Sequence, residues 1–160
     1  MAKLKFEGLD EYEQQLLKLQ DISRECVGQA IYKGAGVVAD AVKRNIESLP
    51  IDARRGVKDG QMLHGITETQ KQGLRDGFGI AKIQNENGYV HVKLGFAGYN
   101  GYITRQYPNG QPNSVIARSV NSGSSFRQRI PFVDNAVNAS KDACEQTMKD
   151  TFDKVLQEKL

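Results

Sequence analysis

The sequence predicts an α+β protein of one domain, residues 1–160. Long N-terminal and C-terminal helices pack on a small antiparallel sheet built around one hairpin, with long loops between these elements. Three observations predict this fold. Residues 26–46 and 132–156 each carry an apolar stripe at helical spacing, and between them two β-like runs flank an Asn-Gly pair. A chain of 160 residues has the length of a single domain, which can bury one modest core.

The N-terminal part is expected to form a short strand at residues 3–7 and then two helices. The first begins near residue 8, and its apolar face consists of Leu9, Tyr12, Leu16 and Leu19. Asp21 or Ser23 can cap a second, longer helix, which Leu49-Pro50 ends. The small residues 34–36 permit close approach of another backbone. The apolar face of this second helix consists of Cys26, Val27, Ala30, Ile31, Gly34, Val37, Val38, Ala41, Val42 and Ile46.

The middle of the chain is expected to hold a loop and then the hairpin. Residues 50–77 are polar and rich in glycine, which predicts a long loop with one helical turn at residues 67–74. Residues 79–84 and 89–96 alternate between polar and apolar side chains and flank Asn85-Glu86-Asn87-Gly88, a pattern typical of a β-hairpin. The alternation places His91 on the polar, solvated face of its strand.

Residues 97–125 are expected to be loop, except for a short helix at residues 114–120 that Asn113 or Ser114 caps. An extended segment at residues 126–130 then leads to Pro131, where the last helix begins, because a proline disfavours helical backbone in the residue before it. The apolar stripe of this helix consists of Phe132, Val133, Ala136, Val137, Ala143, Cys144, Met148, Phe152, Val155 and Leu156, with Ser140 in the gap.

The net charge of +3 comes from one part of the chain. Residues 1–60 hold ten basic and ten acidic residues, residues 121–160 hold six of each, and residues 61–120 hold six basic and three acidic. Residues 87–133, the 47 residues between Glu86 and Asp134, contain no carboxylate at all. This acid-free segment indicates a surface that faces an acidic partner, either protein or nucleic acid. The alternative is a hairpin and loops that carry amides and hydroxyls in place of carboxylates.

The sequence holds no pattern typical of catalysis or of metal or cofactor binding. His64 and His91 lack the spacing of zinc ligands, and no phosphate-binding glycine motif lies between a strand and a helix. Cys26 and Cys144 are interpreted as buried thiols of a reducing compartment, with a disulfide between the two helices as the alternative. No apolar run suits a signal peptide or a membrane span. We therefore expect no enzyme, no cofactor and no membrane contact.

Several short motifs together resemble one family. They are Phe6-Glu7-Gly8-Leu9-Asp10, the small-residue helix at residues 30–41, Val92-Lys93-Leu94-Gly95-Phe96 and Arg129-Ile130-Pro131-Phe132 followed by Ala136. The chain resembles the siphophage minor tail component family, the neck or tail-completion proteins of tailed phages and prophages, here of a Gram-positive host. The resemblance implies a non-catalytic virion protein at the head–tail junction or tail end, which forms a ring, often a hexamer. Its partners would be copies of itself and neighbouring head-completion and tail proteins, first in the host cytoplasm and then in the virion.

A ring uses heterologous contacts, and loops 50–77 and 97–125 suit such assembly. Aromatic and arginine side chains are favoured anchors of protein interfaces. The candidate assembly residues are therefore Tyr99, Tyr102, Arg105, Tyr107, Arg118, Arg127, Arg129 and Phe132. The alternative function is that of a nucleic-acid-binding phage accessory protein. In it, tyrosines would stack bases, and phosphates would be tracked across residues 87–133 by Lys93, Arg105, Arg118, Arg127 and Arg129.

Overall fold

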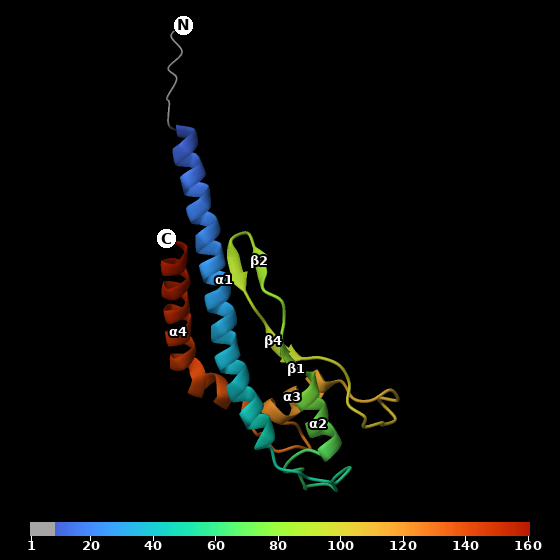
Figure 1. Cartoon of the computed structure of the whole chain (residues 1–160). Coiled ribbons are helices and arrows are strands. Elements are labelled where there is room, and N and C mark those ends of the chain that lie inside the picture. Colours follow the sequence, from blue (N-terminus) through green and yellow to red (C-terminus); the bar gives the residue numbers. More distant parts are fainter. Residues whose placement is uncertain (1–8) are drawn as a thin grey trace.

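One helix, α1 (Leu9–Glu47), runs along most of the length of the molecule (Figure 1). The computed structural model describes the backbone of residues 9–160 and the side chains from residue 13 onward. The strand predicted at residues 3–7 lies outside the described residues.

The prediction of two N-terminal helices is wrong, because α1 continues through residues 20–25 for a total of 39 residues. Asp21 and Ser23 are not at a helix start and cap none. Asp21 instead lies 3.9 Å from Arg24 as an ion pair on the helix surface. No proline or glycine interrupts this stretch, so nothing forces the backbone out of the helical conformation.

The last helix, α4 (Phe132–Lys159), packs antiparallel against α1. The Asn45 side chain near the end of α1 donates to the Phe132 carbonyl at the start of α4 (2.9 Å), and Lys159 at the end of α4 pairs with Glu25 (3.2 Å). Gly34 lets the helices approach closely, since an added Cβ there would lie 2.5 Å from the Met148 Cγ. The expected close approach is thereby confirmed at Gly34, whereas nothing lies within 4 Å of a Cβ added at Gly36.

The predicted stripe of α4 is confirmed at Phe132, Ala136, Ser140 and Val155, which are buried, whereas Val137 and Ala143 are exposed. Both cysteines are free thiols, as the first interpretation expected: Cys26 is buried and Cys144 is partly buried. Burial raises the pKa of the Cys144 thiol, and the nearby Glu145 charge raises it further.

The hairpin is confirmed and carries one irregularity. Strand β1 (Phe78–Ile80) pairs with β4 (Leu94–Phe96), and β2 (Gln84–Glu86) pairs with β3 (Tyr89–His91), both antiparallel. The expected single sheet is thus two separate two-stranded sheets, because between the ladders residues 81–83 of the first arm face only residues 92–93 of the second. At the tip, Asn87 (φ 54°) and Gly88 (φ 87°) form the left-handed pair that a two-residue hairpin turn requires.

His91 differs from its predicted place on a fully solvated face. It is partly buried, its ring stacks on Tyr89 with the ring centroids 5.4 Å apart, and its Nε2 lies 3.2 Å from the Gln84 Oε1. The hairpin lies beside α1 (Figure 1).

Residues 68–77, which were expected to be mostly loop, form the helix α2 (Glu68–Gly77). Thr67 and Gln70 form a capping box at its start, which explains where the helix begins. A further helix, α3 (Asn113–Ser122), confirms the predicted short helix, but neither Asn113 nor Ser114 caps it. The N-cap residue is Pro112, and the Asn113 side chain is buried.

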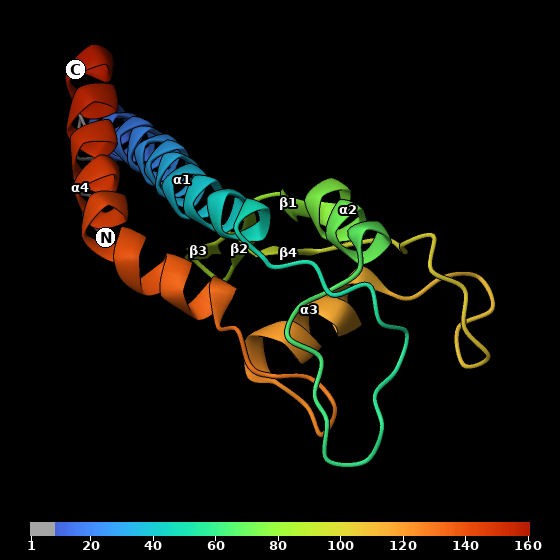
Figure 2. The same ribbon diagram turned by 90° about the horizontal axis from the view of Figure 1, so that it is seen from below.

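The hydrophobic core lies where the end of α1, the hairpin base, α2, α3 and the start of α4 meet. Its aromatic part is a contact series: Phe78 and Phe96 have ring centroids 5.1 Å apart, and Phe96 meets Phe132 at 6.0 Å. Two loops, residues 48–67 and 97–112, extend from this end of the molecule (Figure 2). Among the helices described, none is both long enough and apolar enough to cross a membrane.

Candidate functional site

A cavity of about 630 Å³ lies between loop 48–67, loop 97–112 and α3. Its charged lining consists of four arginines (Arg54, Arg55, Arg105 and Arg127) against one carboxylate, Asp52. We refer to it as the arginine cavity. Apolar side chains complete its lining and give it a mixed character: Val57, Leu63, Val115, Ile116 and Phe126.

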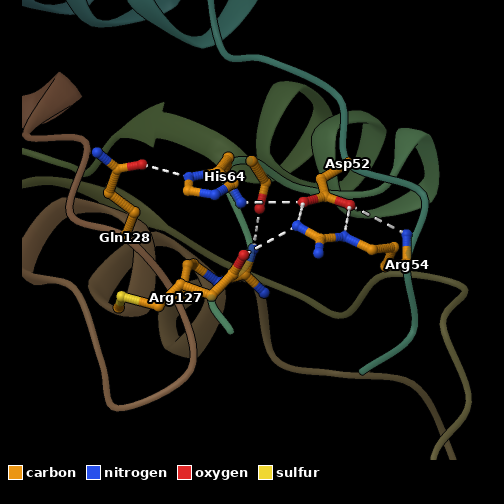
Figure 3. A network of polar contacts seen from close by, with 7 residues as sticks. Asp52, Arg54, His64, Arg127 and Gln128 are labelled. Atoms are coloured by element: carbon orange, nitrogen blue, oxygen red, sulfur yellow. Dashed lines mark hydrogen bonds and ion pairs between the residues drawn. The ribbon is translucent and has the colours of Figure 1, made fainter. Parts of the chain in front are cut away.

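The Asp52 carboxylate holds loop 48–67 together by accepting hydrogen bonds from other residues of the loop (Figure 3). Its carboxylate accepts two hydrogen bonds from the Arg54 guanidinium, Nε to Oδ1 at 2.9 Å and Nη2 to Oδ2 at 2.7 Å, and one from the His64 backbone N–H at 2.9 Å. The hydrogen bonds from Arg54, and then that from His64, hold the pKa of Asp52 well below its usual range. Its negative charge is therefore engaged mainly with Arg54 and, as a single charge against four arginines, leaves an excess of positive charge in the cavity.

Arg127 is a buried cation without a paired carboxylate. Its side chain is only 4% exposed, and its guanidinium donates to two neutral acceptors, the Gly65 carbonyl and the Ser119 Oγ (3.2 Å from Nε). Among the described residues, no carboxylate lies within 4.0 Å of it. Burial lowers the pKa of Arg127, an effect that the charge of Asp52 opposes. An arginine is nevertheless protonated at neutral pH, so a positive charge remains inside the cavity wall.

The position of Arg127 follows from the way the chain pairs with itself at this point. The Leu63 N–H donates to the Phe126 carbonyl (2.8 Å), and the Gln128 N–H donates to the Leu63 carbonyl (2.9 Å). This short parallel bridge joins loop 48–67 to the segment before α4. It fixes Arg127 between the two, as Figure 3 shows, with Gln128 contacting the His64 Nδ1 at 2.5 Å.

Two of the predicted tyrosines also line the cavity. Tyr102 and Tyr107 are partly buried, and the Arg55 guanidinium carbon lies 5.6 Å from the centre of the Tyr102 ring, within reach of a cation–π contact. Arg105 is exposed and belongs to the same lining. The structure thus brings together four of the eight predicted site residues: Tyr102, Arg105, Tyr107 and Arg127.

The other four predicted residues lie elsewhere. Tyr99 is 68% exposed and outside the arginine cavity. Phe132 is 2% exposed and packs in the core, so its ring does not face a partner. Arg129 pairs with Asp134 at 3.3 Å, and Arg118 is exposed on α3. The cations of the acid-free segment lie in different places: Arg129 at the surface before α4, Arg118 on α3, Lys93 in the hairpin, and Arg105 and Arg127 at the cavity.

A network of buried amides fixes the root of loop 97–112. The Asn100 Oδ1 accepts from the backbone N–H groups of Tyr102 (2.9 Å) and Gln111 (3.2 Å). The Gln111 Oε1 accepts from the Gln70 Nε2 (2.9 Å), and the Gln70 Oε1 accepts from the Thr67 N–H in the capping box of α2 (3.0 Å). These residues hold one wall of the cavity against α2, and no sequence pattern marks them.

A second candidate surface is the free part of α1. Every side chain from residue 13 to residue 21 is exposed, including Leu16 (48%), Leu17 (53%) and Leu19 (49%). The ion pair between Lys159 and Glu25 marks where α4 ends along α1, so residues 9–24 extend beyond it (Figure 1). We refer to residues 9–24 as the α1 arm. The predicted apolar face at Leu16 and Leu19 is therefore present but uncovered within the part of the chain that the structure describes.

The fold and these two features define a class: an α+β protein with a basic cavity at one end and, among the described residues, an uncovered helical arm at the other. No family model, curated protein or solved structure matches the chain. Within the described residues, no group of three or more His, Cys, Asp or Glu side chains could hold a metal ion.

Sequence reasoning missed Arg54, Arg55 and Asp52, because they lie outside the acid-free segment. The Arg54-Arg55 pair was a visible signal, but the sequence gives no indication that it meets residues 102–107 in space. The buried amides Gln70, Asn100 and Gln111 carry no sequence signal that separates them from ordinary loop polar residues.

Proposed function

We propose that the protein is a structural subunit of a tailed-phage virion, located at the head–tail junction or tail end, which assembles as a ring with copies of itself and with neighbouring virion proteins. The observation that carries this proposal is the α1 arm. Its 16 residues correspond to about 24 Å of helix. This extension of the helix has no packing partner among the described residues beyond its own backbone hydrogen bonds, and it exposes three leucines. A partner that covers the arm would account for both facts.

Two further features agree with an assembly role. The motifs that resemble the minor tail component family occur across most of the chain, from Phe6-Glu7-Gly8 to Pro131-Phe132. The two loops at the opposite end of the molecule from the arm give each subunit two different surfaces, which is what the heterologous contacts of a ring need.

The alternative function, nucleic-acid binding through residues 87–133, has the missing carboxylates in its favour. The positions of the cations favour it less. A single-strand binder needs a groove in which cations follow the backbone, whereas Arg129 is paired with Asp134 and Arg127 is buried. Affinity for mixed-sequence DNA at low and moderate salt separates the two, because tight and steeply salt-dependent binding by the monomer would support the alternative.

The assembly proposal is tested by measuring mass with light scattering and viewing particles by electron microscopy, with and without the neighbouring virion proteins. We expect rings from the wild-type chain and a loss of association in the double variant Leu16→Ser/Leu19→Ser. Val137→Ser is the matched control, because Val137 is a similarly exposed aliphatic residue (44%) on α4. A wild-type protein that stays monomeric with every candidate partner would refute the proposal.

A further inference from the structure

The arginine cavity has an unbalanced charge. Of its four arginines, only Arg54 has a carboxylate partner, and Asp52 is that partner. Arg55, Arg105 and Arg127 remain, and none of them forms an ion pair among the described residues. Three positive charges therefore line one cavity of about 630 Å³, where mutual repulsion is less screened than on an open surface.

The burial of Arg127 indicates that a negatively charged group would balance the cavity. Arg127 is only 4% exposed and its guanidinium donates only to neutral acceptors, while the charge of Asp52 that acts on it is already engaged by Arg54. Such incompletely balanced burial of a cation is costly in a protein interior. A carboxylate or phosphate oxygen that entered the cavity would supply that counter-charge. The buried guanidinium therefore indicates an anionic ligand, independently of the exposed arginines.

The shape and lining of the cavity favour an acidic protein segment over nucleic acid. Beside the arginines, the lining offers Tyr102 and apolar side chains such as Val57 and Phe126, which suit the hydrophobic and aromatic neighbours of a carboxylate in a peptide. The exposed cations Lys93 and Arg118 do not belong to this lining, so the charge does not continue as a track.

This chain itself contains a segment of the required kind. Residues 9–13, Leu-Asp-Glu-Tyr-Glu, carry three carboxylates and one tyrosine with no basic residue, and they begin the α1 arm. They cannot enter the cavity of their own chain. The 39-residue α1 separates its first residue from the loop that follows its last by about 57 Å, and Figure 1 shows that loop at the far end of the molecule. A second copy can place its acidic segment there.

We propose that residues 9–13 of one copy dock in the arginine cavity of the next, with Asp10, Glu11 and Glu13 facing Arg55, Arg105 and Arg127. The contact is head to tail, and it specifies the interface of the ring in the proposed function, on which it rests. Each contact would cover the start of one arm and neutralise the unpaired charge of one cavity.

The test is a charge exchange in the full-length protein, measured as the dissociation constant of self-association by analytical ultracentrifugation. Arg55→Glu/Arg105→Glu alters the cavity through two exposed side chains and leaves the buried Arg127 in place. Asp10→Lys/Glu11→Lys alters the arm. We expect each variant to weaken association by roughly tenfold or more, because each places like charges opposite one another. The chain that carries all four changes should recover most of the loss.

The matched control is Lys93→Glu/Arg118→Glu, which makes the same charge change at two exposed positions outside the cavity. It should associate like the wild type. Rings that form equally well from the wild type and from both cavity and arm variants would overturn the docking inference while the proposed function stands. The same weakening in the control variant would also overturn it, since net charge alone would then explain the effect.

A second measurement decides the inference even if the wild-type chain does not self-associate. A fluorescein-labelled peptide of residues 5–20 should bind the full-length protein by anisotropy. The same peptide with the changes Asp10→Asn, Glu11→Gln and Glu13→Gln should bind roughly tenfold more weakly or worse, because it lacks the three carboxylates. Equal binding of both peptides would refute the carboxylate contact. Preferential binding of a single-stranded oligonucleotide that depends on Arg55 and Arg105 would replace the peptide with nucleic acid as the occupant.

Discussion

The buried Asn100 side chain allows the clearest test of how loop 97–112 is held. Asn100→Ala keeps the Cβ but removes three hydrogen bonds: those that Oδ1 accepts from the Tyr102 and Gln111 backbone N–H groups, and the one that Nδ2 donates to the Gln111 Oε1 (3.3 Å). At about 1 kcal/mol each, they sum to about 3 kcal/mol. Water can reach part of this loop, so we expect a loss of about 2–3 kcal/mol in the free energy of unfolding.

Urea denaturation followed by circular dichroism measures this loss as a lower midpoint with an unchanged m-value. Asn109→Ala is the control, because Asn109 lies exposed in the same loop and forms no side-chain hydrogen bond in the described structure. Amide hydrogen exchange at Tyr102 and Gln111 should become faster only in Asn100→Ala. If the two variants differ by less than about 0.5 kcal/mol, the amide network does not hold the loop and the reasoning fails.

Three other predictions concern the helix contacts and Asp52. Gly34→Leu should destabilise the fold by about 1–3 kcal/mol, because its side chain would displace Met148. Gly36→Ala should stabilise the fold by about 0.5–1 kcal/mol, since nothing lies within 4 Å of an added Cβ there. Both changes are measured by urea denaturation, and equal effects would refute the packing argument. Lys71→Met should lower the free energy of unfolding by about 1–3 kcal/mol, because the Nζ donates to two carbonyls at the end of α1, and an unchanged midpoint would count against that role. The lowered pKa of Asp52 contributes stability that is present above the ordinary pKa of 3.8 and is lost as the pH falls toward the folded-state pKa. Asp52→Asn should therefore flatten the fall in thermal midpoint below about pH 4. Identical profiles of thermal midpoint against pH for the variant and the wild type would contradict this.

The sequence was sufficient for the elements whose signal is local. The apolar periodicity at residues 26–46 and 132–156 and the Asn87-Gly88 turn depend only on neighbouring residues, and the helices and hairpin are present as α1, α4 and β1–β4. It failed at Asp21 and Ser23, because a capping residue favours a helix start only if the preceding turn is not itself helical. Nothing in residues 13–20 breaks the helix, so α1 continues through Asp21 and Ser23.

The candidate site shows a different limit. The distribution of charge along the chain defines the acid-free segment, but it does not predict where each cation lies. Arg127 and Arg129, two residues apart, lie in different environments. One is buried against the Gly65 carbonyl, and the other pairs with Asp134 at the surface. The cavity gains Arg54 and Arg55 from another part of the chain. Composition predicts that a basic region exists, whereas the long-range pairing of residue 63 with residue 127 decides which cations share it.

The continuity of α1 bears on the proposed assembly. Because the helix is continuous, about 57 Å of α1 separates the acidic start of the arm from loop 48–67, which lines the arginine cavity. Two helices with a hinge at residues 21–23 would have let the arm fold back toward its own body. A continuous helix instead keeps the acidic segment away from the cavity of its own chain, and a directional contact between copies repeated at a constant angle closes into a ring or continues as a filament. The angle between the docked arm and the cavity would then determine the number of subunits in the ring.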